Sequence, residues 1–281
     1  MSERREELNE EKYFKDTEMS FWDHMAELAM RLRRIVIVTL ILTVIYLILP
    51  SQFDINSLTI VLTGKWTLHK PLVGGILDKI KHDLLPSKAI LISHQFANPL
   101  VIYLEAGILL AIITASPYIG YEVYMFVAPG LYPHEKKFLK RFVFAFTGLF
   151  ILGVIYGYYL IMPITFKILV YFSDILGAQP LFDINDFYTL TFVGLAVCGF
   201  FFTMPVFLIL AVKFGVLEVD VLVKNKRYIY VAVFIITAII TPDPTPVSML
   251  LLSIPFIILY EFSIWIGKRV APKETFETTS S

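Results

Sequence analysis

The sequence is poor in cysteine and in charged residues, and each shortage excludes a class of function. The single cysteine, Cys198, lies in an apolar run with no Cys or His at metal-ligand spacing, which excludes an intramolecular disulfide and a zinc site. Charged residues make up 17% of the chain and hydrophobic residues 57%. That balance departs from the composition of soluble domains and indicates a protein surrounded by lipid.

Motifs of enzyme chemistry are missing as well. The sequence has no Gly-rich phosphate loop, no nucleophile motif and no Ser/His/Asp spacing that stands out from chance. We therefore expect no enzyme activity, no cofactor, no metal and no nucleic-acid partner.

The chain does contain long apolar segments separated by short charged ones. A hydrocarbon core of roughly 30 Å is crossed by about 20 helical residues. We predict an all-α integral membrane protein whose membrane domain, residues 20–267, holds six transmembrane helices in a cupped bundle. Pro117 should kink or break the second span, whereas the third can continue as helix beyond Pro163. The predicted spans cover residues 35–49, 99–127, 142–172, 187–212, 228–240 and 247–266, of which the last two are short.

The basic residues predict the orientation of these spans. Every arginine and most lysines lie on one side of the predicted membrane, and such residues prefer the cytoplasm. We therefore expect two cytoplasmic tails, residues 1–19 and 268–281. The first 34 residues are too long and too acidic for the leader of a cleavable signal, so we expect the first span to be retained. The lack of a transit-type segment favours a prokaryotic plasma membrane.

Four residues before the first span share one helix face. His24, Glu27, Leu28 and Arg31 follow i, i+3, i+4, i+7 spacing, on a helix that we expect to lie along the cytoplasmic interface. One interpretation, which the spacing alone favours, is a Glu27–Arg31 ion pair on a solvated face. In the other, Glu27 and Glu135 receive two guanidinium groups through bidentate hydrogen bonds. Glu135 has its own structural alternative, as an acid in the first turn of a helix.

Three further carboxylates, Glu105, Glu122 and Glu261, fall within predicted spans. Such groups are costly unless paired, hydrated or near an interface. Local hydrogen bonding at an interface is our preferred interpretation for Glu122 and Glu261, and Glu105 is left open. The alternative is a proton relay in a small-solute transporter, but Glu105 and Glu122 lie about 25 Å apart along a straight helix.

In their order along the chain, several motifs resemble the TatC family, the multi-spanning receptor subunit of the twin-arginine protein translocase. The resemblance extends from about Ser20 to Ile266 and is weakest in the loop between the first two spans. Singly the motifs are weak, but in this order and with six spans they are highly specific. They are His24-Met25-Ala26-Glu27-Leu28 with Arg31-Leu32, Phe126-Val127-Ala128-Pro129-Gly130-Leu131-Tyr132 with His134-Glu135, Gly199 with Pro205, Lys226-Arg227-Tyr228, Thr241-Pro242, Ile254-Pro255 and Tyr260-Glu261.

The resemblance implies a protein that binds the paired arginines of export signals on folded cargo. It implies no covalent chemistry and no cofactor. Small single-span subunits would be its partners in an oligomeric complex that works with the proton-motive force. Glu27 and Glu135 would contact the arginines, and neighbouring residues would shape the same cytoplasmic surface. These are Phe126, Pro129, Leu131 and Tyr132, with His24 and Arg31 on the face of Glu27.

Some positions depart from the family pattern or match it only loosely. Thr203 stands where an intramembrane Glu or Gln is common, so its hydroxyl must suffice for partner docking or another group such as Glu105 takes part. Ala29 replaces a usual arginine and Tyr124 a frequent tryptophan. Pro71 matches a proline of the first outer loop. Besides the receptor and the transporter, a purely structural scaffold is the third hypothesis that the sequence leaves open.

Overall fold

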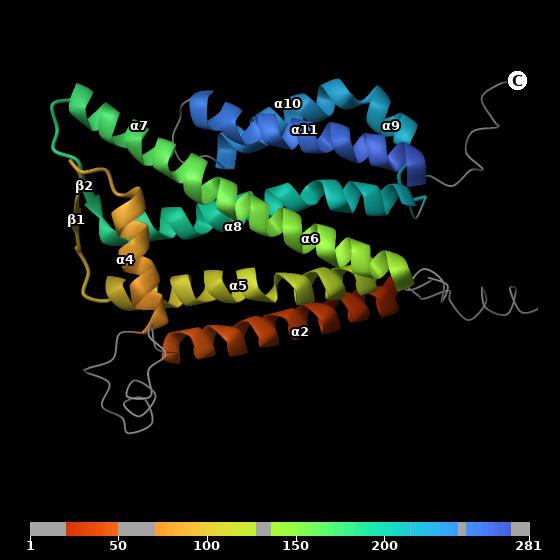
Figure 1. Ribbon diagram of the computed structural model, residues 1–281, viewed down its shortest axis with the longest axis horizontal. Helices are drawn as coiled ribbons and strands as arrows, with labels where there is room; N and C mark the ends of the chain where they lie inside the picture. The colour runs from red at the N-terminus through yellow and green to blue at the C-terminus, as the bar shows by residue number, and fades with distance from the viewer. Residues whose placement is uncertain (1–20, 50–70, 128–135, 214, 241–245, 271–281) are drawn as a thin grey trace, which may run out of the picture.

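The computed structural model describes residues 21–49, 71–127, 136–213, 215–240 and 246–270, and within them the chain is mostly helical (Figure 1). Its long helices run side by side between two ends of the molecule. The first element is α2 (Phe21–Ile48) and the last is α11 (Pro246–Val270). Between them lie α4 (Leu72–Leu84), β1 (Ile90–Ile92), α5 (Asn98–Val127), α6 (Lys136–Tyr156), the π-helical turn η3 (Gly157–Ile161), α7 (Met162–Ile175), β2 (Leu181–Asp183), α8 (Ile184–Lys213), α9 (Val219–Lys224) and α10 (Lys226–Ile240).

Four segments of the described chain are long and apolar enough to cross a membrane: Asn98–Phe126, Lys140–Ile175, Ile184–Lys213 and Pro246–Arg269. The helix α10 has 15 residues, which rise about 22 Å and fall short of a core of roughly 30 Å. In α2 the uninterrupted apolar part begins only after Arg34. The prediction that the last two spans are short is wrong for α11, which has 25 residues.

The helix α2 is a single unbroken helix of 28 residues. We expected its first turns to lie along the membrane interface, but they continue directly into the apolar part. The reason is local, since the stretch from Phe21 to Ile48 contains neither Pro nor Gly to end the helix. The segment that carries His24 and Glu27 therefore projects along the axis of the predicted first span.

Prolines do not break the long helices. The helix α5 is continuous through Pro117. Pro117 has no N–H to donate to the carbonyl oxygen of Ile113, and the Ser116 hydroxyl donates to that oxygen instead, at 2.8 Å. The third span also continues past Pro163, as predicted, because the wider π turn η3 precedes the proline.

The close contact between α6 and α8 requires a residue without a side chain. A Cβ atom at Gly153 would lie 2.5 Å from the backbone oxygen of Cys198 and 2.9 Å from the Cβ of Phe202. Both distances are shorter than real contacts allow, so the two backbones approach here only because position 153 is Gly. The buried Cys198 is thus part of a packing contact.

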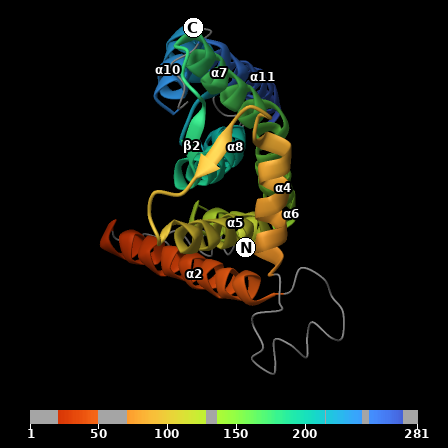
Figure 2. The same ribbon diagram turned by 90° about the vertical axis from the view of Figure 1, so that its left-hand side faces the viewer.

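The segment between the first two spans contains structure that was not predicted from the sequence. The helix α4 buries Val73, Leu77, Ile80 and Leu84 at helical spacing against the bundle. The strands β1 and β2 pair in parallel, with Leu91 opposite Phe182. Figure 1 shows α4, β1 and β2 at the same end of the molecule, and Figure 2 views the molecule from that end. We call this the outer-loop end.

The helices pack as a bent row. The helix α2 contacts α5, which contacts α6 and α8, while α8 contacts α11 and α11 contacts α10. In Figure 2 the row curves from α2 on one side to α10 and α11 on the other. Three buried apolar clusters hold it together, one under α4, one among α5, α6 and α8, and one among α8 to α11. They are centred on Leu77, Phe166 and Leu195, on Phe142, Phe146 and Leu210, and on Phe256, Tyr260 and Ile264.

Candidate functional site

Arg31 joins two helices through two carboxylates. Its Nε donates to Oε1 of Glu27 at 2.8 Å, one turn back on α2, and its Nη1 donates to Oε2 of Glu122 on α5 at 2.9 Å. The side chains of Arg31 and Glu27 are 14% and 15% exposed, and that of Glu122 is 3% exposed. The Glu27–Arg31 pair that the spacing predicted therefore exists, but it is largely buried against α5 and not on a solvated face.

Glu122 has further partners at this depth. The hydroxyl of Tyr118 donates to its Oε1 at 2.8 Å, and Nη1 of Arg34 lies 3.9 Å from the same oxygen. A buried carboxylate is tolerable only when its charge and lone pairs are matched in this way. The local hydrogen bonding that we preferred for Glu122 is confirmed, and the contact with Arg31 adds a link between segments 91 residues apart.

Glu122 was not predicted to belong to the candidate binding surface. One signal was available, because Arg31 and Arg34 lie one turn apart on α2, and Tyr118 and Glu122 lie one turn apart on α5. Their meeting depends on how α2 packs on α5, which neither segment specifies by itself.

Glu27 retains an unused acceptor. Its Oε2 is buried and has no hydrogen-bond partner in the part of the chain that the structure describes. Beside it lies a hollow of about 380 Å³ whose lining includes two carboxylates and two guanidinium groups, from Asp23, Ala26, Glu27, Met30, Arg31 and Arg34. A carboxylate oxygen that is free to accept a bond next to an open volume is suited to receive a cationic donor.

Burial alone would lower the pKa of Arg31. The hydrogen bonds with Glu27 and Glu122, and the charges of these two carboxylates, outweigh that effect, so the pKa lies above its usual value. Arg31 is therefore permanently cationic and competes with any incoming cation for Glu27.

Two aromatic rings stack on each other where the start of α2 meets the end of α5. His24 stacks on Phe126, with ring centroids 4.4 Å apart and planes inclined by 17°. This contact places the first turns of α2 against the last turn of α5, as Figure 1 shows for the two helices. The other predicted members of the surface, Pro129, Leu131, Tyr132 and Glu135, lie outside the described residues.

The remaining intramembrane carboxylates have other partners. The hydroxyl of Thr189 donates to Glu105 at 2.7 Å, linking α5 to α8. Glu261 on α11 accepts hydrogen bonds from Lys226, at 2.6 Å, and from Tyr230, both on α10. Each carboxylate thus bonds to its own set of neighbours, an arrangement that does not favour the proton relay of the transporter hypothesis.

Thr203 is buried and uses its hydroxyl within its own helix. It is 1% exposed, and its Oγ1 donates to the backbone oxygen of Phe200 at 2.7 Å. The hydroxyl at this position therefore satisfies a local bond and does not present a polar group to a neighbouring helix.

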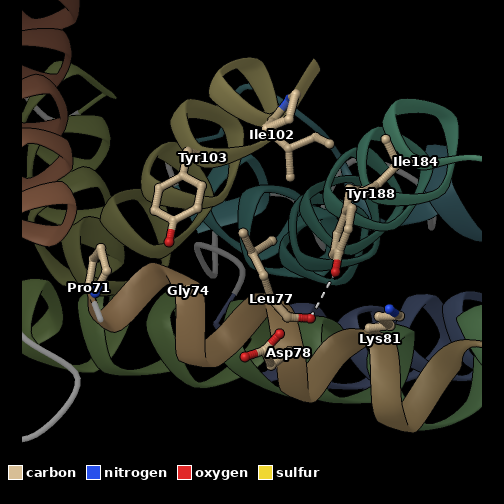
Figure 3. Close-up of a pocket in the computed structure, with 10 residues that line it drawn as sticks. Pro71, Gly74, Leu77, Asp78, Lys81, Ile102, Tyr103, Ile184 and Tyr188 are labelled. Atoms are coloured by element: carbon tan, nitrogen blue, oxygen red, sulfur yellow. Dashed lines mark hydrogen bonds between the residues drawn. The ribbon is translucent and has the colours of Figure 1, made fainter. Parts of the chain in front are cut away.

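Pro71 lies at the outer-loop end, where it precedes the first turn of α4. It borders a hollow of about 410 Å³ between α4, α5 and α8, shown in Figure 3. The hydroxyl of Tyr188 donates to the backbone oxygen of Leu77 at 3.0 Å, and the ring of Tyr103 lies over Gly74. The lining residues are Pro71, Gly74, Leu77, Asp78, Lys81, Pro99, Ile102, Tyr103, Ile184 and Tyr188.

At the same end, Asp183 connects β2 to the start of α5. Its Oδ2 lies 2.6 Å from Nδ1 of His94, and its Oδ1 accepts a bond from Nδ2 of Asn98 at 3.2 Å. The hydrogen bond with His94, followed by that from the backbone N–H of Asn185, lowers the pKa of Asp183. The carboxylate thus secures the short parallel sheet to the bundle.

Long apolar helices joined by ion pairs and small-residue contacts define an integral membrane protein with several spans. The family model described as Sec-independent protein translocase protein (TatC) matches residues 23–255. The chain belongs to this TatC family, a family of protein transport and not of enzymes, and it is a component of the twin-arginine translocase. The resemblance predicted from the sequence is confirmed.

Curated relatives match over almost the full chain. The TatC protein of Carboxydothermus hydrogenoformans is 32% identical over 260 residues, which cover 92% of this chain and 97% of the relative. TatCy of Bacillus subtilis is 27% identical over 259 residues, 92% of each chain. Among solved structures, the crystal structure of a twin-arginine translocase receptor TatC is 27% identical and superposes with a TM-score of 0.68. That match covers 88% of this chain and 99% of the solved one.

Proposed function

We propose that this chain is the receptor subunit of its translocase and binds twin-arginine signal peptides of folded cargo at Glu27 and Glu135. The observation that carries the proposal is the Oε2 of Glu27, buried beside the hollow at the start of α2 and without a hydrogen bond from any described residue. A guanidinium group matches a carboxylate in a bidentate geometry that an ammonium group does not provide. The similarity to a solved TatC that is itself a twin-arginine translocase receptor supports this assignment.

Arg31 gives this site a mechanism of partner exchange. It already bonds to Oε1 of Glu27, and the buried Oε2 becomes reachable when Arg31 moves away. Because Glu122 also holds Arg31, the displaced guanidinium would not be left buried without a counter-charge. A signal arginine can then take the place of Arg31 on Glu27, and the apolar stretch of the signal can enter the membrane beside the bundle.

The proposal includes six spans, with both termini in the cytoplasm of a prokaryotic cell. The four segments that are long enough to span would be joined by the apolar part of α2 and by α10, the latter across a locally thinned bilayer. The first half of α2, the start of α6 and the end of α11 lie at one end of the helix row in Figure 1, and these segments carry Arg31, Arg141 and Arg269. We call this the basic end and place it on the cytoplasmic side. Single-span subunits would assemble on this scaffold when the proton-motive force is present.

The first test is photo-crosslinking in native membranes from a residue beside the arginine pair of an export signal. An Arg-Arg signal should crosslink to the regions of Glu27 and Glu135, and a Lys-Lys signal should not. Equal crosslinking of both signals, or of neither, would reject guanidinium recognition at this surface.

A binding measurement separates the residues of the site. Glu27→Gln should weaken binding of a labelled Arg-Arg peptide by about ten-fold or more, since a hydrogen bond to a charged group contributes about 1.5–3 kcal/mol. Arg31→Gln should strengthen binding, because it removes the internal competitor for Glu27. Weaker binding in Arg31→Gln would contradict partner exchange. Arg33→Gln, an exposed position on the same helix, is the matched charge control.

A further inference from the structure

A second hollow at the basic end has no part in the proposed signal site. It is an apolar groove of about 660 Å³ between α6, α8 and α11, with Arg141 at one end. We call it the α6–α8–α11 groove. Its lining consists of Arg141, Phe142, Phe144, Ala145, Gly148, Leu149, Leu152, Pro205, Val206, Ile209, Leu259, Phe262 and Ile266.

The length of this groove matches one leaflet of a bilayer. Along α6 its lining runs from Arg141 to Leu152, and the eleven steps between these residues rise about 16 Å. A hydrocarbon core is roughly 30 Å thick, so the groove covers about half of it. A transmembrane partner helix would need a groove of the full thickness, whereas a lipid acyl chain needs only one leaflet.

Three residues place the basic end of the groove at the depth of the headgroups. Arg141 is exposed, precedes the apolar run of α6, and has no ion pair among the residues that the structure describes. On α11, Trp265 stacks on the lining residue Phe262 with ring centroids 5.7 Å apart, and the guanidinium of Arg269 lies 3.6 Å from the centre of the Trp265 ring. Tryptophan and arginine in this arrangement are typical of the membrane interface.

We propose that the α6–α8–α11 groove binds an anionic diacyl phospholipid, with an acyl chain along the apolar lining and the headgroup phosphate on Arg141. Arginine binds phosphate through paired N–H donors, and a cation that no described residue pairs with at this depth favours a lipid with net negative charge. The protein would thus carry a lipid against α6, with the headgroup at Arg141 near the start of that helix.

Gly148 provides a variant that fills the groove without disturbing the fold. A Cβ atom at this position meets no atom within 4 Å, so Gly148→Leu can place its side chain in the groove. Arg141→Gln removes the headgroup partner. Arg33→Gln on α2 is the matched control, because it removes an exposed arginine at the basic end away from the groove.

The test is native mass spectrometry of the full-length protein released from micelles that contain equal amounts of phosphatidylglycerol and phosphatidylcholine. The unmodified protein and Arg33→Gln should retain phosphatidylglycerol preferentially. Arg141→Gln should lower that preference about five-fold, the effect of one basic side chain near an anionic surface. Gly148→Leu should lower retention of both lipids while leaving the thermal unfolding midpoint unchanged.

Two results would overturn the proposal. The first is the same lipid preference in Arg141→Gln and Arg33→Gln. The second comes from a photo-reactive residue in place of Phe144, which is 83% exposed in the groove lining. In native membranes it should label phospholipid, and labelling of a single-span subunit or a signal peptide instead would assign the groove to a protein segment.

Discussion

Replacing Glu122 with Gln keeps the volume of the side chain and removes its charge. Arg31 would lose one of its two carboxylates but keep Glu27 at 2.8 Å. Leaving a buried charge without any partner costs about 3–5 kcal/mol. Because Glu27 remains, the expected loss is closer to that of one charged hydrogen bond, about 2 kcal/mol of the free energy of unfolding.

Replacing Arg31 is expected to cost more stability than replacing Glu122. Arg31→Gln leaves Glu122 buried, with Tyr118 as its neutral donor and Arg34 only at 3.9 Å. That variant should lose about 3 kcal/mol or more. The double variant should lose less than the sum of the two single ones, with a coupling free energy of about 2 kcal/mol.

Denaturant titration in mixed micelles, followed by tryptophan fluorescence, measures these four free energies. Glu105→Gln is the matched control, since it is the same substitution on α5 and its carboxylate bonds to Thr189. Glu105 lies about 25 Å from Glu122 along the helix, so its effect should add to that of Arg31→Gln without coupling. A coupling near zero between Arg31 and Glu122 would refute the claim that this ion pair joins α2 to α5.

Two further predictions concern packing and pH. Gly153→Val should prevent the close packing of α6 on Cys198 and abolish the monodisperse peak in size-exclusion chromatography, whereas Gly148→Val, at an open position of the same helix, should elute normally. The lowered pKa of Asp183 means that its contribution to stability is present above the usual carboxyl pKa of 3.8 and is lost as the pH falls through the lowered value. Proteolysis of the outer-loop end should therefore accelerate only in strong acid, and Asp183→Asn, which weakens the bond to His94, should remove that pH dependence.

Much of the helical architecture can be predicted from the sequence because it follows from local composition. The helices α5 and α8 have 30 residues each and are mostly apolar, and lipid requires such runs to be helical. The buried positions of α4 could also have been predicted, since Val73, Leu77 and Ile80 share a helix face. They were missed because the flanking stretch is polar and mixed.

Other features depend on contacts that no local pattern contains. The strands β1 and β2 have three residues each and meet across about 90 positions, so neither is a strand without the other. The continuity of α2 follows from its lack of Pro and Gly. We nevertheless predicted that its first turns lie along the interface, because they are charged. The contact of Arg31 with Glu122 needed the packing of two helices.

The buried Oε2 of Glu27, to which no described residue donates a hydrogen bond, is a feature that stability alone does not explain. Buried polar atoms in native proteins are almost always hydrogen-bonded, and an unsatisfied carboxylate oxygen is costly. A sequence optimised only for stability would have a neutral residue at position 27, and Arg31 would then pair with Glu122 alone. The chain instead keeps a second carboxylate that shares the same arginine, and in our proposal this surplus acceptor binds a guanidinium group of the signal peptide. If the proposal holds, stability and recognition place opposite demands on Glu27, whereas Glu122 supports both by holding Arg31.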